Sequence, residues 1–305
     1  MQSPAHTYLL GGGPLHLQQQ DLAAAPRVLA LHDLSGFGRC SLAVILPVLS
    51  CMGAQVVQVP TAVLSSHTGG LGDPVLRDLS DMLLPTLQHY RQLGLDFAAV
   101  YSGFFSSAGQ VSACRAYCQA FPQALKVIDP VMGDDQKAYR TCTGQLMAQM
   151  RPLIAEADVI TPNETEAAIL LGEDHTRRRV FDAAGARRWL VGLAGLGCKS
   201  VVITGCHMPD GRYNLVYSGG AYSRVRAEYL PVGYPGTGDI FTSALTGRLL
   251  GGDALPQAAS FAAQFVERAI ALTQKAGTDR RWGVQLEKAL PWLFAPELQQ
   301  RVSPL

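Results

Sequence analysis

The sequence predicts an α/β fold in which helices cover both faces of a central, mostly parallel sheet. Short apolar runs rich in Val, Ile and Ala, each too short for a helix, alternate with longer stretches of helical periodicity. Strand–helix alternation of this kind is typical of parallel sheets that are wrapped on both faces. The chain has 305 residues, of which 48% are hydrophobic and 16% charged, so it can bury the large core that such a fold needs.

The elements follow one another in a regular order along the chain. The expected strands are the apolar runs 27–31, 55–60, 97–102, 125–129, 158–161 and 200–204. The expected helices are 40–52, 74–93, 110–121, 143–157, 163–171 and 181–196. After residue 204 the pattern changes to a hairpin, 213–217 and 221–226, joined by Ser218-Gly219-Gly220. Two long helices are expected to follow, from Asp239 and from Leu255.

The composition points to one globular domain and excludes several classes of protein. We expect a loosely ordered N-terminal extension at 1–25, with Gly11-Gly12-Gly13 and Gln18-Gln19-Gln20, and one domain at 26–305. No apolar run reaches the roughly 18 residues of a membrane span. A net charge of +1 offers no basic field for nucleic acid or an anionic membrane. Seven cysteines without the dense spacing of a secreted scaffold predict reduced thiols in a cytoplasmic protein.

Polar residues recur directly after the expected strands. In open α/β sheets, ligands bind at the carboxyl ends of the strands, so we expect the functional site at this edge. The residues in question are Asp33 after the first strand, Thr61 and Ser65–Thr68 after the second, Ser102–Phe104 after the third, Asp129–Asp134 after the fourth, Thr161–Asn163 after the fifth, and Thr204-Gly205 after the sixth.

The segment Gly236-Thr237-Gly238-Asp239 is a glycine-rich turn that leads into a helix. Its glycines allow a tight turn and close approach to a ligand. Backbone amides at a helix N-terminus favour an anion such as a phosphoryl group, and Asp239 beside them is placed to accept a proton from an attacking hydroxyl. An ordinary turn, with Asp239 complementing the helix dipole, is the competing interpretation.

Asp134 and Glu166 are candidate ligands for the Mg²⁺ that phosphoryl transfer from ATP requires. Each has a structural alternative. Asp129-Pro130 and Gly133-Asp134 also suit simple turns. Asn163 is a plausible N-cap with Glu166 as its capping-box partner, and for these two residues the cap is the favoured interpretation.

Other patterns resemble functional motifs without completing them. Gly36-Phe37-Gly38 lacks the third glycine of a dinucleotide fingerprint, because Ser41 stands there, and no acidic residue follows about 20 positions on. His32 and His67 are each a single histidine in a polar loop, for which structural hydrogen bonding is the default. The run Arg177-Arg178-Arg179 is expected to be a solvated loop face.

Four motifs together carry a resemblance to a known family. Ser66-His67-Thr68-Gly69, Asp129–Asp134, Asn163-x-x-Glu166 and Gly236–Asp239 occur in one order between about Arg27 and Glu297. With them the chain resembles the ribokinase superfamily, and within it the pyridoxal kinase branch. The resemblance implies a ribokinase-like fold, a homodimer, and ATP-dependent phosphorylation of the 5′-hydroxymethyl group of pyridoxal, pyridoxine or pyridoxamine, with Mg²⁺ and a monovalent cation, K⁺ or Na⁺.

The resemblance also implies roles for single residues. Asp239 would be the catalytic base, and the amides of Gly236, Thr237 and Gly238 the anion hole. The nucleotide and metal contacts that it implies are Asp129 near the γ-phosphate, Asn163, Thr204 and Gly205 on the nucleotide, Asp134 and Glu166 in the metal shell, and Thr161 on a monovalent cation. The implied substrate contacts are Asp33 and Thr68 at the pyridine edge and Phe104 near the ring.

The chain departs from the family pattern at two of these positions. Many pyridoxal kinases have Ser where Asp33 stands and Tyr where Phe104 stands, and Asp33 would suit a substrate amine or ring nitrogen. Asp33-Leu34-Ser35-Gly36 also resembles hydroxymethylpyrimidine kinases, but those usually carry a Gly-Thr-Gly-Cys turn where this chain has Asp239. The alternatives are therefore a hydroxymethylpyrimidine or other small-alcohol kinase, and a non-catalytic carrier of vitamin B6 or nucleotide.

Overall fold

The computed structural model describes residues 7–10, 13–16, 24–228 and 233–305. Most of the expected N-terminal extension, including Gln18-Gln19-Gln20, lies outside these residues. Two strands within it, where no regular element is expected, pair antiparallel with each other: β1 (Thr7–Leu10) and β2 (Gly13–His16).

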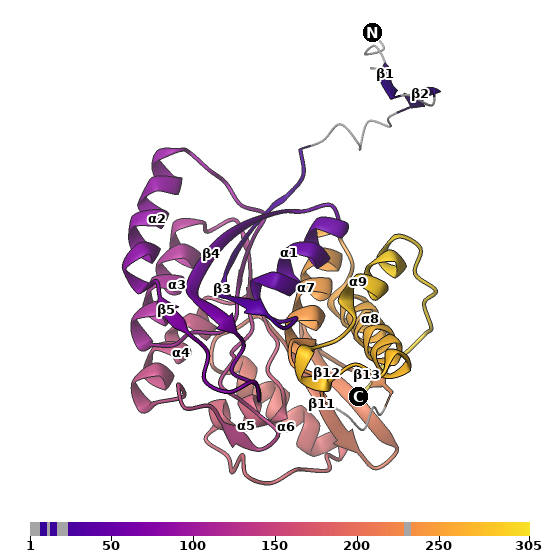
Figure 1. Ribbon diagram of the computed structural model, residues 1–305. Coiled ribbons are helices and arrows are strands. Elements are labelled where there is room, and N and C mark those ends of the chain that lie inside the picture. Colours follow the sequence, from indigo (N-terminus) through magenta and orange to yellow (C-terminus); the bar gives the residue numbers. More distant parts are fainter. Residues whose placement is uncertain (1–6, 11–12, 17–23, 229–232) are drawn as a thin grey trace.

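A ten-stranded sheet forms the body of the molecule, in the order β14-β13-β12-β11-β10-β7-β6-β3-β4-β5 (Figure 1). Its strands are β3 (Arg27–Phe37), β4 (Gln55–Ser66), β5 (Leu76–Asp78), β6 (Ala99–Ser102), β7 (Leu125–Ile128), β10 (Val159–Ile160), β11 (Ser200–Met208), β12 (Gly211–Ser218), β13 (Ala221–Ala227) and β14 (Val302–Pro304). The central strands from β11 to β4 pair in parallel, and the antiparallel pairs lie at the two edges. The predicted mostly parallel sheet and the hairpin β12–β13 are confirmed.

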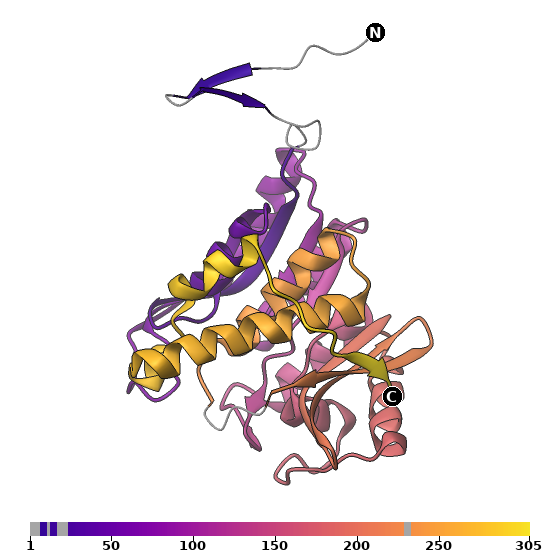
Figure 2. The ribbon, with the colours of Figure 1, turned by 90° about the vertical axis from the view of Figure 1, so that its right-hand side faces the viewer.

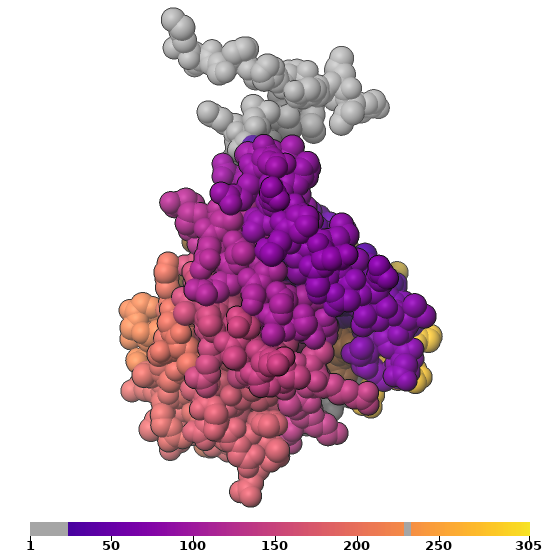
Figure 3. Space-filling view, turned by 90° about the vertical axis from the view of Figure 1, so that its left-hand side faces the viewer, coloured from indigo at the N-terminus to yellow at the C-terminus, as the bar shows by residue number. Residues whose placement is uncertain are grey.

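Helices cover both faces of this sheet, as predicted. One face carries α2 (Ser80–Gln92), α3 (Ala108–Ala120), α4 (Gly144–Ala155), α5 (Glu164–Leu171) and α6 (Ala183–Ala194). Figure 3 shows part of this face from outside, where the purple and magenta residues form a continuous covering. The other face carries α1 (Leu42–Cys51), α7 (Thr237–Leu250), α8 (Leu255–Ala276) and α9 (Leu286–Ala289), with α7 and α8 packed together (Figure 2).

The apolar strand residues alternate between these two cores. Val127 and Val159 pack among the buried residues of α7 and α8, whereas Ile128 and Ile160 pack with those of α3 to α6. Successive side chains of a strand point to opposite faces, so strands that are buried on both faces read as unbroken apolar runs. Among the described residues, no helix combines the length and apolarity that a membrane span requires.

Several boundaries differ from the sequence-based expectation. β3 and β4 run past their expected ends at 31 and 60, because each continues to pair with the other as far as Phe37 and Ser66. The helix expected from Pro74 begins only at Ser80, since Leu76–Asp78 forms an edge strand on the extended part of β4 instead. Long-range pairing therefore overrides the local pattern in both places.

Two strands change register at residues that the sequence marks as functional. β3 shifts against β4 between His32 and Leu34, and β11 shifts against β12 between Ile203 and Cys206. Such irregularities re-aim side chains, and they are frequent beside active sites. Asp33 lies at the first shift, and Thr204-Gly205 at the second.

Candidate active site

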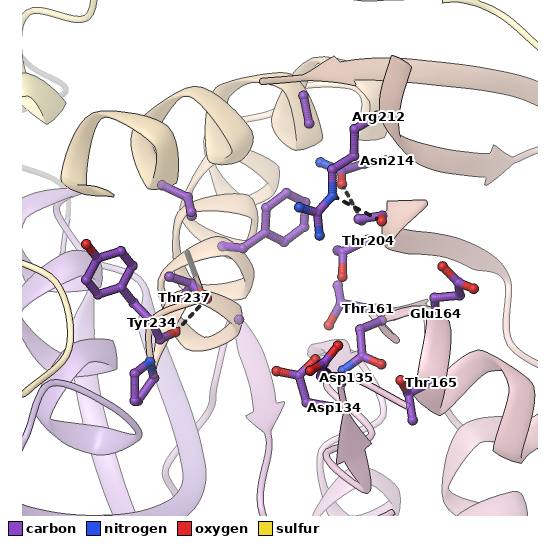
Figure 4. Close-up of a pocket in the computed structure, with 18 of the residues that line it drawn as sticks. Asp134, Asp135, Thr161, Glu164, Thr165, Thr204, Arg212, Asn214, Tyr234 and Thr237 are labelled. Carbon is purple, nitrogen blue, oxygen red and sulfur yellow. Dashed lines mark hydrogen bonds between the residues drawn. The ribbon is translucent and has the colours of Figure 1, made fainter. Parts of the chain in front are cut away.

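A cavity of about 790 Å³ opens between the start of α7 and the carboxyl ends of β10 and β11 (Figure 4). Half of the predicted site residues line it: Asp134, Thr161, Asn163, Thr204, Gly205, Thr237 and Gly238. Figure 4 shows Thr237 on the α7 side and Thr161, Thr204, Arg212 and Asn214 on the opposite side. The cavity therefore lies at the carboxyl edge of the parallel sheet, where the sequence places the candidate site.

The glycine-rich turn leads directly into the N-terminus of α7. Gly236 precedes α7 with φ 80°, and a Cβ there would collide with the carbonyl oxygen of Arg39, so only glycine fits. The hydroxyl of Thr237 donates to the carbonyl of Tyr234 at 3.0 Å and holds the turn closed. The first amides of a helix have no intrahelical acceptor, and here they lie beside the cavity that Thr237 and Gly238 line.

Asp239 lies in the first turn of α7 and is buried, with 8% of its surface exposed. Its Oδ2 accepts the backbone N–H of Ser41 at 2.7 Å, and its Oδ1 lies 3.0 Å from Nε2 of His32. The carboxylate is therefore held between β3, α1 and α7. The sequence did not single out either of these partners as functional.

Asp129 stands beside the same helix start. A Cβ on Gly238 would lie 3.9 Å from Oδ2 of Asp129, and the Thr242 hydroxyl donates to that oxygen at 3.4 Å. Burial and the charge of Asp239 raise the pKa of Asp129 to about 7, although the charge of His32 opposes the shift.

The predicted capping box at the start of α5 is confirmed. The side chain of Asn163 accepts the Glu166 amide at 2.9 Å, and Oε2 of Glu166 accepts the Asn163 amide at 2.8 Å. The other carboxylate oxygen of Glu166 accepts the Met132 amide at 3.1 Å. Burial, followed by the charge of Asp129, raises the pKa of Glu166 well above its usual range.

The carboxylates of this region fit a magnesium ion that arrives with a nucleotide. Among the residues that the structure describes, no three His, Cys, Asp or Glu side chains form a ready-made metal cage. Mg²⁺ at phosphate sites takes one or two carboxylates and completes its shell with water and phosphate oxygens. Asp134 lines the cavity, and the charges of Asp129 and Asp134 both raise the pKa of Glu166, so a cation there would relieve their repulsion.

The opposite wall of the cavity is built on the irregular segment of β11. Gly205 has φ 72°, its amide donates to Oδ1 of Asn214 at 3.0 Å, and its carbonyl accepts Nε of Arg212 at 3.2 Å (Figure 4). Arg212 and Asn214 were not predicted. Their signal is two polar side chains two residues apart, on one face of the hairpin strand β12.

Two further observations concern the polar lining of the cavity. The Thr161 hydroxyl lies 3.0 Å from that of Thr242, and a role for Thr161 on a monovalent cation stays a prediction. The run Arg177-Arg178-Arg179 forms an exposed loop face, as expected, and this loop also lines the cavity. Arg178 pairs there with Asp135 at 3.1 Å. Its clustered positive charge suits a polyphosphate.

The predicted substrate residues do not line this cavity. Asp33 is 5% exposed and accepts hydrogen bonds from His32 and from the hydroxyls of Ser35 and Ser41. Thr68 is exposed, while the backbone N–H of Phe104 points at His32 from 3.2 Å. The roles of Asp33, Thr68 and Phe104 toward a substrate stay predictions.

His67 has the structural role that was the default for it. The amide of Gly69 donates to Nδ1 at 2.9 Å, and Nε2 lies 2.7 Å from the carbonyl oxygen of Arg281. The imidazole thereby ties the loop after β4 to the segment after α8. A Cβ on Gly38 would collide with this ring, which accounts for the glycine.

Comparison with known proteins now identifies the family. Residues 49–282 match the family described as phosphomethylpyrimidine kinase. The chain belongs to this family. The kinase is 31% identical to a pyridoxal kinase of Rubrobacter xylanophilus, over 82% of this chain and 88% of the relative. A Bacteroides thetaiotaomicron protein, named as a phosphomethylpyrimidine kinase and crystallised with pyridoxal, is 37% identical, with a TM-score of 0.87 over 92% of this chain and 100% of that one.

These relatives confirm the predicted membership of the ribokinase superfamily and its fold. The kinase is a phosphotransferase that acts on an alcohol group. A hydroxymethylpyrimidine/phosphomethylpyrimidine kinase of Mycobacterium bovis is also similar, with 25% identity over 79% of this chain and 86% of the relative. The relatives thus differ in the ring of the substrate for which they are named.

Proposed function

We propose that this kinase uses ATP to phosphorylate the 5′-hydroxymethyl group of pyridoxal, pyridoxine or pyridoxamine. The observation that carries the proposal is the position of Asp239: a buried carboxylate in the first turn of α7, beside the Gly236–Gly238 turn and next to the cavity. A base and an anion hole on one helix start suit the transfer of a phosphoryl group to a hydroxyl. The similarity to a protein crystallised with pyridoxal supports the vitamin B6 ring.

The transfer follows from this arrangement. The substrate hydroxyl oxygen attacks the γ-phosphorus of ATP in line, the bond from that phosphorus to the β,γ-bridging oxygen breaks, and ADP leaves. The hydroxyl proton passes to Asp239, while the first amides of α7 hold the charge that develops on the transferred group. Mg²⁺ held through Asp134, with Glu166 behind it, would neutralise charge on the phosphates.

On the nucleotide side, Thr204, Gly205 and Asn163 would contact ATP, and Arg212 and the Arg177–Arg179 run would face its phosphates. The same wall holds Asp134, so the triphosphate and its cation would lie together. The substrate alcohol would then approach the γ-phosphate from the side of Asp239, with the pyridine ring toward β3 and β4.

A substrate panel tests this function directly. ADP release is measured with pyridoxal, pyridoxine, pyridoxamine and hydroxymethylpyrimidine, each with ATP and MgCl₂ and each against a blank without acceptor. We expect ADP release that depends on the B6 vitamers, with kcat/KM at least about tenfold above that for hydroxymethylpyrimidine, a ratio of about 1.4 kcal/mol.

Two other outcomes would assign the protein differently. A preference for hydroxymethylpyrimidine would support the second candidate, which the family match and the Mycobacterium bovis relative favour. Binding of a vitamer without any ADP release would identify a carrier instead of an enzyme. Isothermal titration with each vitamer distinguishes that case from a protein that binds none of them.

A further inference from the structure

His32 lies between two carboxylates, and it was left unassigned by the sequence motifs. Its side chain is 2% exposed, with Nδ1 at 2.8 Å from Oδ1 of Asp33 and Nε2 at 3.0 Å from Oδ1 of Asp239. An ionised carboxylate can only accept hydrogen bonds, so a ring nitrogen at such a distance must carry a hydrogen. Two carboxylates at opposite ring nitrogens therefore favour the doubly protonated imidazolium.

Two backbone amides also face the ring, and they favour the alternative state, in which the nearby ring nitrogen carries no hydrogen. The N–H of Asp33 lies 2.9 Å from Nδ1, and that of Phe104 lies 3.2 Å from Nε2. Each would suit a ring nitrogen without a hydrogen. At both nitrogens, however, the carboxylate oxygen is the nearer group, and its charge makes the bond stronger. The imidazolium is thus the better match to the contacts on both sides.

The local backbone is shaped to hold this ring. The register shift of β3 lies between His32 and Leu34, which allows the consecutive side chains of His32 and Asp33 to contact each other. Gly103 leaves room for the imidazole, because a Cβ there would collide with Cδ2 and Nε2 of His32. A regular strand with a larger residue at 103 could not place the ring beside α7.

Ser41 closes the network from the other side. Its hydroxyl donates to Oδ1 of Asp33 at 2.7 Å, and its amide donates to Oδ2 of Asp239 at 2.7 Å. It does so with φ 56°, in the left-handed region that few non-glycine residues occupy. A glycine would adopt this φ without strain, but it would lack the hydroxyl that reaches Asp33. We call Asp33, His32, Ser41 and Asp239 the His32 network.

The charges around the ring explain why a cation is needed. Asp33 from β3, Asp239 from α7 and Asp129 from the loop after β7 face it, and the Tyr101 hydroxyl on β6 lies 3.5 Å from the Asp239 carbonyl oxygen. Among the described residues, His32 is the only basic side chain within ion-pair distance of Asp239. Burial lowers the pKa of His32, but Asp239 and Asp33 together raise it to about 10.

We propose that His32 is a positioning residue for Asp239, in which the imidazolium fixes the carboxylate and balances its negative charge next to Asp129 and the phosphates of ATP. The inference rests on the proposed function, because it takes Asp239 as the base. Without the neighbouring cation, a buried carboxylate beside other anions is protonated more easily, and a protonated carboxylate cannot accept the hydroxyl proton. Asp33 contacts the ring at its other nitrogen, and the Ser41 hydroxyl in turn donates to Asp33.

The test compares His32→Gln and His32→Asn in the full-length enzyme, with pyridoxal and ATP, from pH 5.5 to 9.5. The glutamine amide nitrogen can replace Nε2 as a donor to Asp239 but carries no charge, whereas the asparagine amide reaches only the position of Nδ1. We expect His32→Gln to lower kcat at neutral pH by about tenfold or more, and His32→Asn to lower it further. We expect KM for ATP to stay within about twofold of the wild type.

The pH profile separates this role from a merely structural one. Loss of the cation moves the acid limb of kcat to higher pH by about one to three units in His32→Gln, so that activity recovers partly in alkaline buffer. A structural defect would lower kcat by the same factor at every pH. The matched control is His89→Gln, the same substitution at an exposed histidine of α2, which is expected to leave kcat and its pH profile unchanged.

Asp239→Asn, measured in parallel, distinguishes the inference from the function on which it rests. Near-normal turnover of Asp239→Asn would show that Asp239 is not the base, and it would contradict the proposed function. Loss of turnover in Asp239→Asn, combined with a wild-type kcat and pH profile in His32→Gln, overturns the inference alone. If His32→Gln does not bind ATP because it misfolds, Asp33→Asn decides: we expect a smaller shift of the acid limb in the same direction, and an unshifted limb overturns the inference.

Discussion

The two sides of the candidate active site differ in how deeply their charged groups are buried. On the side of β3, the His32 network buries two carboxylates and an imidazole in direct contact with one another. On the side of β11, the cavity is open, and Thr204, Arg212 and Asn214 line it. The proposed chemistry explains the difference, because a base must be fixed and shielded from water, whereas a nucleotide must enter and leave in every turnover.

The same backbone device builds both sides. A register shift re-aims Asp33 in β3 and Thr204-Gly205 in β11. On the β3 side, the polar groups at the shift bond to charged side chains. On the β11 side, the amide and the carbonyl of Gly205 bond to Asn214 and Arg212 of the neighbouring strand. A buried ionic network tolerates the loss of one partner poorly, because the remaining charge is then neither paired nor solvated by water. Substitutions on the β3 side should therefore act on kcat, and those on the β11 side on KM.

The largest effect on kcat is expected at Asp239. A small effect there would contradict the proposed difference between the β3 and β11 sides. Asp239→Asn keeps the shape of the side chain but removes the proton acceptor. We expect kcat to fall by about 10²–10⁴-fold, the usual contribution of a general base, with the affinity for ATP nearly unchanged. Steady-state kinetics and titration with ATP measure the two quantities. A loss of ATP affinity with kcat retained would instead place Asp239 on the nucleotide side.

The next effect is expected at the turn that separates the two sides. Gly236 and Gly252 both have positive φ, 80° and 90°, but a Cβ at 236 meets the Arg39 backbone, whereas a Cβ at 252 meets open space. Gly252→Ala should cost about 1 kcal/mol through strain alone. Gly236→Ala should cost more and lower kcat by about tenfold or more as the helix start moves. The free energy of unfolding in urea and kcat are measured for both variants. Equal losses of stability would contradict the expected collision at residue 236.

A smaller effect is expected on the β11 side. Arg212→Gln removes a donor to the Gly205 carbonyl and a positive charge in the cavity wall. We expect KM for ATP to rise by about five- to tenfold, as the loss of about 1 kcal/mol would give, with kcat within about threefold. Arg224→Gln, on β13 and paired with Asp210 outside the cavity, is the matched control. A fall in kcat at constant KM for ATP would contradict the expectation that substitutions on the β11 side act on KM.

The smallest effect concerns the pH dependence of stability. The pKa of His32 in the folded protein is about 10, above its usual 6.5, so the contribution of its charge to stability is complete below about 6.5 and is lost as pH rises through about 10. Between pH 7 and 9.5, the Tm of the wild type should therefore fall more than that of His32→Gln, by about 2 °C or more. Parallel melting curves across this range would show that the ring is not charged.

Local sequence patterns predicted the elements that depend on neighbouring residues or on apolar periodicity. The Asn163–Glu166 capping box was predicted as observed, and the strand expected at 125–129 and the helix expected from Asp239 correspond to β7 (Leu125–Ile128) and α7 (Thr237–Leu250). Edge strand β5 was predicted as part of a helix, because its partner lies in the extension of β4. His32 was read as a structural histidine, since its partner Asp239 is separated from it by most of the chain.

By itself, the sequence determined the α/β alternation, the edge of the sheet at which the site lies, and the glycine-rich turn that ends in Asp239. These follow from periodicity and from residues that act within a few positions of each other. Only the tertiary structure decided that Asp239 is held by His32 and Ser41, and that Arg212 and Asn214 line the cavity beside Gly205. The reason is physical: a register shift moves side chains to new faces only when two strands pair, and charges interact through distances in space that sequence separation does not reveal.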